Sequence, residues 1–183
     1  MAKGRTRRAS GTSSHRRRVT RGPDLSGIRI LILDFDGVMT DNRVLVMQDG
    51  TEGVLCNRSD GLGIGMLSRT GFPIVVISTE TNPVVSARCK KLKLPCTQGH
   101  EDKLAALKVV LEERGMSLAE TAYLGNDLND LPCLRAVGLP MAVADAYPEV
   151  LDVAKLVTRR PGGFGAVREV TDLFLRHIRE FPG

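Results

Sequence analysis

A short apolar run that ends in acidic residues constrains this chain more than any other feature. The run over residues 27–33 (GIRILIL) contains three isoleucines, and Asp34, Asp36 and Asp41 follow it closely. A continuous apolar run of this kind is typical of a strand buried on both faces of a parallel sheet. Because burying like charges close together is unfavourable, we expect a compensating cation beside the acids at the end of this strand.

Further apolar runs alternate with segments that have helical periodicity or helix caps. Strands are predicted over residues 73–78, in the segment TAYLG that ends at Gly125, and over residues 140–144 and 154–158. Helices are predicted over residues 61–70, 82–92, 100–115 and 167–177, with a short one starting at Asp130. This alternation predicts an α/β protein with a Rossmann-like parallel sheet and helices on both faces.

One insertion interrupts the alternation. The pair Asp49-Gly50 lies between two short apolar segments, which predicts a small β-hairpin over residues 42–57, directly after the first strand. No other insertion is long enough to form a lid, so we expect no separate cap domain. The whole of residues 23–183 is then expected to form a single domain.

Residues 1–22 differ in composition from the rest of the chain. They hold eight of the 26 Lys and Arg residues and no acidic residue, so the net charge of +5 becomes −3 for the remainder. Few large apolar residues occur there, which predicts a disordered basic tail. Nucleic-acid binding by this tail is an alternative that we disfavour, because Arg-rich tails are usually just solvated.

Composition also excludes several classes of protein. No apolar run approaches the length of a membrane span, and the N-terminus lacks the apolar segment of a secretory signal. The four cysteines form no C-x-x-C pair, so a zinc site is not expected. We therefore expect a cytoplasmic protein with reduced thiols, no membrane contact and no His-ligated metal.

Polar residues follow each predicted strand at the edge where ligands bind to open α/β sheets. Besides the opening acids, the set comprises Ser78, Thr79 and Glu80 after the second strand, Asn126, Asp127 and Asp130 after the third, and Lys103 at the start of the intervening helix. Taken singly, each of these residues has an ordinary structural explanation as a cap, turn or solvated side chain. Their arrival in order at one sheet edge is what indicates a site.

Each residue type in this set has a chemical use in phosphoryl transfer. Carboxylates from two strand ends can share Mg²⁺, and an Asp carboxylate can attack phosphorus. A second Asp two residues further on can act as general acid and base. The Ser78 hydroxyl and the Lys103 ammonium can hold phosphoryl oxygens, while Gly37 allows a turn that directs backbone N–H groups at the phosphate.

The same residues resemble the motifs of the haloacid dehalogenase superfamily of phosphotransferases. DFDGVMTD resembles the first motif, ISTE the second, Lys103 the third and GNDLND the fourth, over residues 28–175. The wider combination of NRSDGLGI, DKLAAL, YLGNDLNDLPCLRAVGLPMAVADAYPEV and GGFGAVREV is similar to the branch of the 3-deoxy-D-manno-octulosonate 8-phosphate phosphatases. It is also similar to the phosphatase-like domain of some acylneuraminate cytidylyltransferases.

The resemblance implies a role for each matched residue. Asp34 would be the nucleophile, forming an aspartyl-phosphate, and a Mg²⁺ ligand. Asp36 would be the acid/base and would ligate Mg²⁺ through its backbone carbonyl. The remaining implied sets are Ser78, Thr79, Lys103 and Gly37 for phosphate, Asn126, Asp127 and Asp130 for the metal, and Arg58, Asp60 and Glu80 for the substrate.

The resemblance also implies an assembly. Members of this branch lack a cap and close their sites by forming a homotetramer, so the partner subunit and the GGFGAVRE loop are expected to contribute to closure. Asp41 is expected to anchor the hairpin and not to touch phosphorus.

Two positions depart from the pattern of the resemblance. Asn126 stands where the superfamily most often has Asp, so either its amide oxygen or Asp127 would complete the metal site. Thr79-Glu80 stands where octulosonate phosphatases commonly have Gly-Arg, which reverses a charge near an acidic sugar and favours a nine-carbon sugar acid or another sugar phosphate.

Two alternatives to an active phosphatase follow. The first is a catalytically weak assembly domain that supports a cytidylyltransferase. The second is a receiver-type signalling domain, which the D-x-D spacing and the hairpin disfavour.

Overall fold

A six-stranded parallel sheet forms the centre of the protein. The computed structural model describes residues 23–180, so the predicted basic tail, residues 1–22, lies outside the described residues. The strand order is β5-β4-β1-β6-β7-β8, and every neighbouring pair is parallel. The strands are β1 (Ile30–Leu33), β4 (Ile74–Ile77), β5 (Cys96–Thr97), β6 (Thr121–Gly125), β7 (Leu139–Ala142) and β8 (Leu156–Val157). The predicted fold class is confirmed, although the two-residue edge strand β5 was not predicted.

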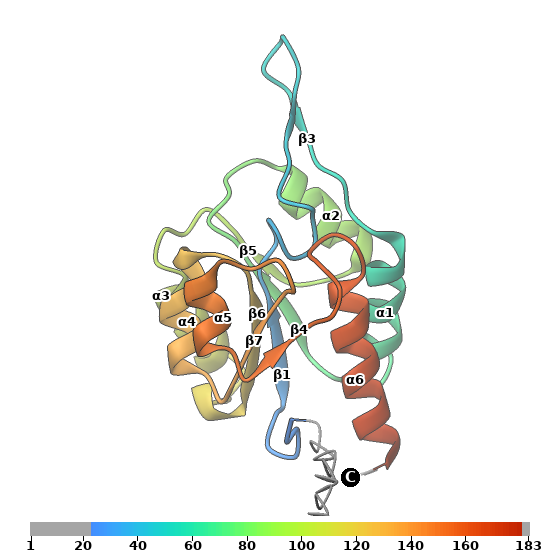
Figure 1. Cartoon of the computed structure of the whole chain (residues 1–183), viewed down its shortest axis with the longest axis vertical. Coiled ribbons are helices and arrows are strands. Elements are labelled where there is room, and N and C mark those ends of the chain that lie inside the picture. The colour runs from blue at the N-terminus through green and yellow to red at the C-terminus, as the bar shows by residue number, and fades with distance from the viewer. Residues whose placement is uncertain (1–22, 181–183) are drawn as a thin grey trace, which may run out of the picture.

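Helices cover both faces of this sheet. They are α1 (Arg58–Ser68), α2 (Val84–Leu92), α3 (Lys103–Glu112), α4 (Leu131–Ala136), α5 (Pro148–Val153) and α6 (Ala166–Glu180), with short 3₁₀ helices η1 (Leu118–Glu120) and η2 (Leu128–Asp130). In Figure 1, α1 and α6 lie side by side on one side of the sheet, and α3, α4 and α5 lie on the other. This placement agrees with right-handed crossovers between parallel strands.

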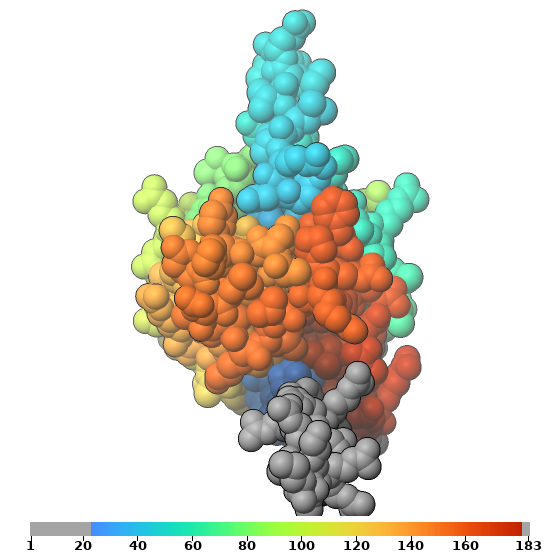
Figure 2. All heavy atoms as spheres, viewed as in Figure 1, coloured from blue at the N-terminus to red at the C-terminus, as the bar shows by residue number. Residues whose placement is uncertain are grey.

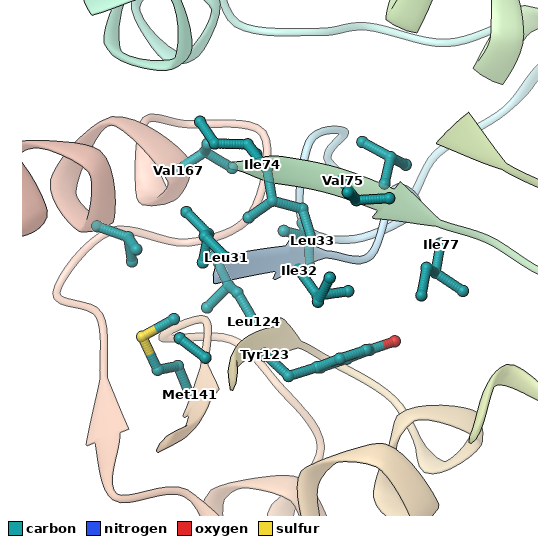
Figure 3. Close-up of a cluster of buried hydrophobic side chains, with 14 of the residues drawn as sticks. Leu31, Ile32, Leu33, Ile74, Val75, Ile77, Tyr123, Leu124, Met141 and Val167 are labelled. Atoms are coloured by element: carbon teal, nitrogen blue, oxygen red, sulfur yellow. The ribbon is translucent and has the colours of Figure 1, made fainter. Parts of the chain in front are cut away.

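The core lies between the three central strands and the helices. All four residues of β1 are buried, and so are all four of β4, which explains why both strands are continuous apolar runs in the sequence. Figure 3 shows Leu31, Ile32 and Leu33 of β1 packed between side chains of β4 and β6. The sheet is therefore a rigid platform for the residues that follow its strands.

The first helix starts earlier than predicted and turns a different face to the core. Asn57 caps it, with Oδ1 accepting from Ser59 N at 2.8 Å. Leu62, an apolar residue at helical spacing from Met66, is exposed, while Gly63 and Ile64 are buried. The reason is α6, which approaches so closely that a Cβ on Gly63 would lie 2.2 Å from Thr171 Oγ1.

The predicted hairpin is present and projects from the body of the protein. Its strands β2 (Leu45–Val46) and β3 (Glu52–Gly53) pair antiparallel, and Figure 2 shows it standing clear of the sheet and helices. It carries five large exposed apolar side chains, namely Val44, Leu45, Val46, Met47 and Leu55. Within residues 23–180 no other insertion forms a cap over the sheet edge.

None of the helices in the described part of the chain is both long and apolar enough to cross a membrane.

Candidate active site

The carboxyl ends of β1, β4 and β6 bring the predicted residues together. Leu33 pairs with Val76 and with Leu124, so the three strands end at nearly the same level. Asp34, Ser78 and Asn126 follow these strands and are all buried. Sheet register, which fixes one strand end relative to the next, is therefore what assembles the site.

Lys103 lies at the centre of the cluster. Its Nζ is 2.8 Å from Asp34 Oδ1 and 2.8 Å from Asp130 Oδ1. The residue begins α3, whose N-cap is Asp102. Only 2% of Lys103 is exposed, so its ammonium is the positive charge that compensates the acidic strand end within the protein itself.

Burial and neighbouring negative charges raise the pKa values of both Asp34 and Asp36. Burial, with repulsion from Asp130, raises the pKa of Asp34 to about 8, and Lys103 opposes this shift. Burial and the nearby Glu80 charge raise the pKa of Asp36, again against Lys103. An additional cation at this position would favour the ionised forms.

Asp130, which was predicted to be a metal ligand, holds several groups of the site in place. Its Oδ1 accepts from Lys103 Nζ and from the Tyr123 hydroxyl, each at 2.8 Å. Its Oδ2 accepts from the backbone N–H groups of Asn126 at 2.9 Å and Asp127 at 3.3 Å. Four donors occupy this carboxylate, which speaks against direct ligation of a metal by Asp130.

Asn126 is placed to serve a metal site. One terminal atom of its side-chain amide lies 3.2 Å from Asp34 Oδ2 and 2.9 Å from the Asp36 carbonyl oxygen. As nitrogen, this atom donates to both oxygens; as oxygen, it completes a set of three converging oxygens, which are the ligands that Mg²⁺ prefers. Half a turn of the amide interconverts the two arrangements, so the residues present fit a divalent cation.

This oxygen set differs from an ordinary cluster of metal-binding side chains. In residues 23–180, no three His, Cys, Asp or Glu side chains gather as a metal site. Two of the three converging oxygens come instead from the backbone carbonyl of Asp36 and the side-chain amide of Asn126. Asp127, the predicted alternative ligand, instead accepts from Leu128 N at the start of η2.

Gly37 makes the predicted turn but uses its N–H within the loop. Its φ is +75°, and a Cβ there would lie 2.0 Å from the Asn126 amide, so only glycine fits. Its own backbone N–H donates to Thr40 Oγ1 at 3.1 Å, so Gly37 contributes the turn, and any backbone N–H group directed at a phosphate would come from another residue of the loop. Thr40 was missed because a threonine in a loop carries no distinctive signal.

Ser78, Thr79 and Glu80 follow β4 with different orientations. The buried Ser78 Oγ accepts from Glu80 N at 3.0 Å, which leaves its proton free for another acceptor. Thr79 is half-buried, and its hydroxyl is 3.5 Å from Asn129 Nδ2. The Glu80 carboxylate accepts from Thr81 N at 2.7 Å and Asn82 N at 2.8 Å, so it caps the segment that enters α2.

The predicted substrate residues at the start of α1 separate into two kinds. Arg58 is exposed, in keeping with a contact to a ligand. Asp60 is buried, and its Oδ1 accepts from Arg168 N at 2.7 Å, so it caps the start of α6. This position speaks against the predicted substrate role of Asp60.

Asp41 behaves as expected. Its carboxylate accepts from the Arg43 side chain and backbone at the base of the hairpin.

The GGFGAVRE loop packs directly on the loop that carries the opening acids. Gly163 N donates to Val38 O at 3.0 Å, and a Cβ on Gly162 would lie 1.8 Å from Gly37 O. The two loops thus support each other through backbone atoms, with no room for side chains between them.

Tyr123 is a residue that sequence reasoning missed. It lies in the buried strand β6, where an aromatic residue is read as core, and Figure 3 shows its ring in the apolar cluster with the hydroxyl pointing away. That hydroxyl reaches Asp130. A buried tyrosine usually has a hydrogen-bond partner, which is the only signal that could have found it.

A parallel α/β sheet with a D-x-D loop, a buried lysine and a strand-end serine defines a hydrolase of the haloacid dehalogenase-like class. The family model of haloacid dehalogenase-like hydrolases matches residues 86–167. The 3-deoxy-D-manno-octulosonate 8-phosphate phosphatase of Escherichia coli K12 is 40% identical over 149 residues, which cover 81% of this chain and 79% of that protein. The chain belongs to this family of haloacid dehalogenase-like phosphatases.

Solved structures agree with this assignment. A protein from Streptomyces avermitilis, described as a HAD family hydrolase, is 48% identical, with a TM-score of 0.79 and coverage of 82% of this chain and 86% of that one. The 3-deoxy-D-manno-octulosonate 8-phosphate phosphatase of Moraxella catarrhalis is 33% identical, with a TM-score of 0.80 and coverage of 83% and 88%. That structure is a complex with magnesium, phosphate and the sugar acid KDO.

Proposed function

We propose that this protein hydrolyses a sugar acid phosphate in a Mg²⁺-dependent reaction that passes through a phosphorylated Asp34. The observation that carries the proposal is the buried contact of Lys103 with Asp34, 2.8 Å long, beside the free Ser78 proton. A nucleophilic carboxylate, a cation and a hydroxyl donor together match the needs of phosphoryl transfer. Mg²⁺, when bound by Asp34, the Asp36 carbonyl and Asn126, would neutralise charge on the phosphoryl group.

The chain's own residues account for both halves of the reaction. The Asp34 carboxylate attacks phosphorus, and the bond from phosphorus to the sugar oxygen breaks as Asp36 donates a proton to that oxygen. Asp36 then removes a proton from water, which attacks the phosphorus and releases phosphate from Asp34. The raised pKa of Asp36 suits the first of these proton transfers. Ser78 and Lys103 hold the phosphoryl oxygens throughout.

The named substrates of the relatives give the first candidates. 3-Deoxy-D-manno-octulosonate 8-phosphate is the substrate in the name of the E. coli relative. Nonulosonate phosphates are the second candidate, because Glu80 stands where octulosonate phosphatases commonly have Arg, which reverses a charge near the substrate. Phosphate release should be measured for both substrates, with and without Mg²⁺. Near wild-type turnover by Asp34→Asn would overturn the nucleophile assignment, and turnover without any divalent cation would overturn the metal requirement.

We also propose that the exposed hairpin joins copies of this chain into a tetramer. The five exposed apolar side chains of the hairpin support this, since a patch of this kind marks an interaction site. The neutral Asn126 favours, as a second candidate function, a weakly active assembly domain with a cytidylyltransferase partner. Absence of turnover across a sugar phosphate panel, with intact tetramers, would favour that second function. A cytoplasmic location stays a prediction.

A further inference from the structure

A cavity of about 550 Å³ lies along α6 and is lined by residues other than those of the phosphoryl site. It is lined by Ser59, Arg159, Arg160, Arg168, Glu169, Asp172 and Arg176. None of these residues belongs to the cluster around Asp34 and Lys103. Its volume falls within the range of sites that hold small metabolites.

The cavity is lined by a net positive charge, whereas the chain beyond residue 22 has a net negative charge. Four arginines and two acids line it, a local charge of +2, whereas the chain beyond residue 22 carries −3 in total. The excess is therefore a local feature and not a consequence of overall charge.

Both acids of the cavity are already engaged with two of the arginines. Glu169 Oε1 accepts from Arg159 Nε at 3.3 Å, and Asp172 Oδ1 accepts from Arg168 Nε at 2.8 Å. In residues 23–180, neither Arg160 nor Arg176 forms an ion pair. Arg160 also acts electrostatically on the buried Asp60 carboxylate, without an ion pair to it. Two of the four lining arginines therefore have no carboxylate of this part of the chain within ion-pair distance.

The backbone that carries Arg160 is held in place. Glu169 accepts from the backbone N–H groups of Arg159 at 3.1 Å and Arg160 at 3.2 Å, which ties this segment to α6. Arg160 also lies over Gly165, where a Cβ would be 3.1 Å from its Nη1. A backbone fixed in this way keeps the Arg160 side chain on the same side of the cavity, so less freedom is lost when an anion binds.

We propose that this arginine cavity binds a small phosphorylated anion that carries at least two negative charges. Guanidinium groups bind phosphate oxygens in bidentate fashion, and two unpaired ones match two charges or more. A pyrophosphate-type group satisfies both conditions. The site is separate from the reaction centre and does not depend on the proposed catalytic function.

Calorimetric titration with pyrophosphate in Mg²⁺-free buffer tests the proposal. The double variant Arg160→Gln/Arg176→Gln should bind pyrophosphate at least about tenfold more weakly than the wild type, because two charge-assisted contacts are lost. The matched control is Arg135→Gln/Arg179→Gln, which removes the same charge from exposed positions outside the cavity. It should leave the affinity within about twofold.

A third variant, Ser78→Ala, separates the two sites. It alters the phosphoryl site and should leave this affinity unchanged. Equal affinity of the cavity variant and its control would overturn the proposal, as would loss of binding in Ser78→Ala alone or no measurable binding by the wild type. Circular dichroism checks folding, and if the double variant unfolds, Arg176→Gln alone should still weaken binding about threefold.

Discussion

Lys103 Nζ lies 2.8 Å from Asp130 Oδ1, and both side chains are almost completely buried. This ion pair links the start of α3 to the end of η2, beneath the opening acids. Its position makes Asp130 the support of Lys103 and of the Asn126 backbone. Asp130 therefore differs from Asp34 and Asp36: it holds neighbouring groups in place, whereas those two are the proposed reacting acids.

Loss of this support should be costly for stability. Asp130→Asn removes one of the two carboxylate partners of the buried ammonium and leaves Asp34 as the other. We therefore expect the free energy of unfolding to fall by roughly 1.5–3 kcal/mol, as for the loss of a hydrogen bond to a charged group. The control is Asp172→Asn, which breaks the half-buried i,i+4 pair with Arg168 on α6 and should cost about 0.3–0.5 kcal/mol. Urea denaturation measures both, and equal losses would contradict a supporting role of Asp130.

Restoring a carboxylate at position 126 should strengthen metal binding. Asn126→Asp adds a negative charge among the oxygens of Asp34 and Asp36, so Mg²⁺ affinity should rise about tenfold. In Mg²⁺-free buffer, the same variant should melt at a lower temperature, because like charges then meet within 3.2 Å. Calorimetry and thermal melts measure the two effects. Asp127→Asn is the control and should leave the Mg²⁺ affinity unchanged. A loss of Mg²⁺ affinity in Asp127→Asn would assign the ligand role to Asp127 instead.

A methyl group between the two packed loops should disturb the site. Gly162→Ala would bring a Cβ within 1.8 Å of Gly37 O, so the loop that carries Asp36 must shift. We expect turnover to fall by at least about tenfold and stability to drop by about 1–3 kcal/mol. Gly53→Ala, in the hairpin with nothing within 4 Å, is the matched control. Equal activity of the two variants would exclude mutual support between the loops.

Asp60 should make stability depend on pH. Burial raises its pKa above the ordinary value of an aspartate, and its Oδ2 has no hydrogen-bond partner. A carboxyl whose pKa is raised by folding contributes stability below the pKa of the unfolded chain, which is lost as pH rises through the folded value. As the pH rises from acidic to neutral, the wild type should therefore lose stability that Asp60→Asn keeps. The variant should gain stability relative to the wild type over this range.

Asp60→Ala tests the capping role of the same residue. It removes the acceptor of Arg168 N and should destabilise the protein by about 1 kcal/mol. Urea denaturation at several pH values compares all three proteins. A stability difference between wild type and Asp60→Asn that does not change with pH would rule out the inferred shift.

A charge on the hairpin should break the proposed tetramer. Leu45→Asp puts a carboxylate on the apolar patch, so light scattering should report a smaller particle. Val109→Asp, at an exposed position on α3, is the control and should leave the mass unchanged. A monomeric wild type would contradict the proposed assembly.

The sequence alone determined the fold class and the sheet edge at which most residues of the candidate site gather. Continuous apolar runs such as β1 can be satisfied only between two helical layers, and parallel strands place Asp34 and Ser78 at one edge. Asp49-Gly50 marked the hairpin because that turn requires residues tolerant of positive φ. These features depend on local periodicity, which the order of residues contains in full.

Tertiary structure alone decided which polar residues face the site and which hold it together. Asp60 and Asp130 looked like ligands in the sequence, but α6 and Lys103 bury them as a helix cap and an ion-pair partner. The exposure of Leu62 and the contact of the Tyr123 hydroxyl with Asp130 have the same origin, a neighbour from elsewhere in the fold. The partner of a buried polar group comes from a distant segment, and strand register and helix contact, not local periodicity, select that partner.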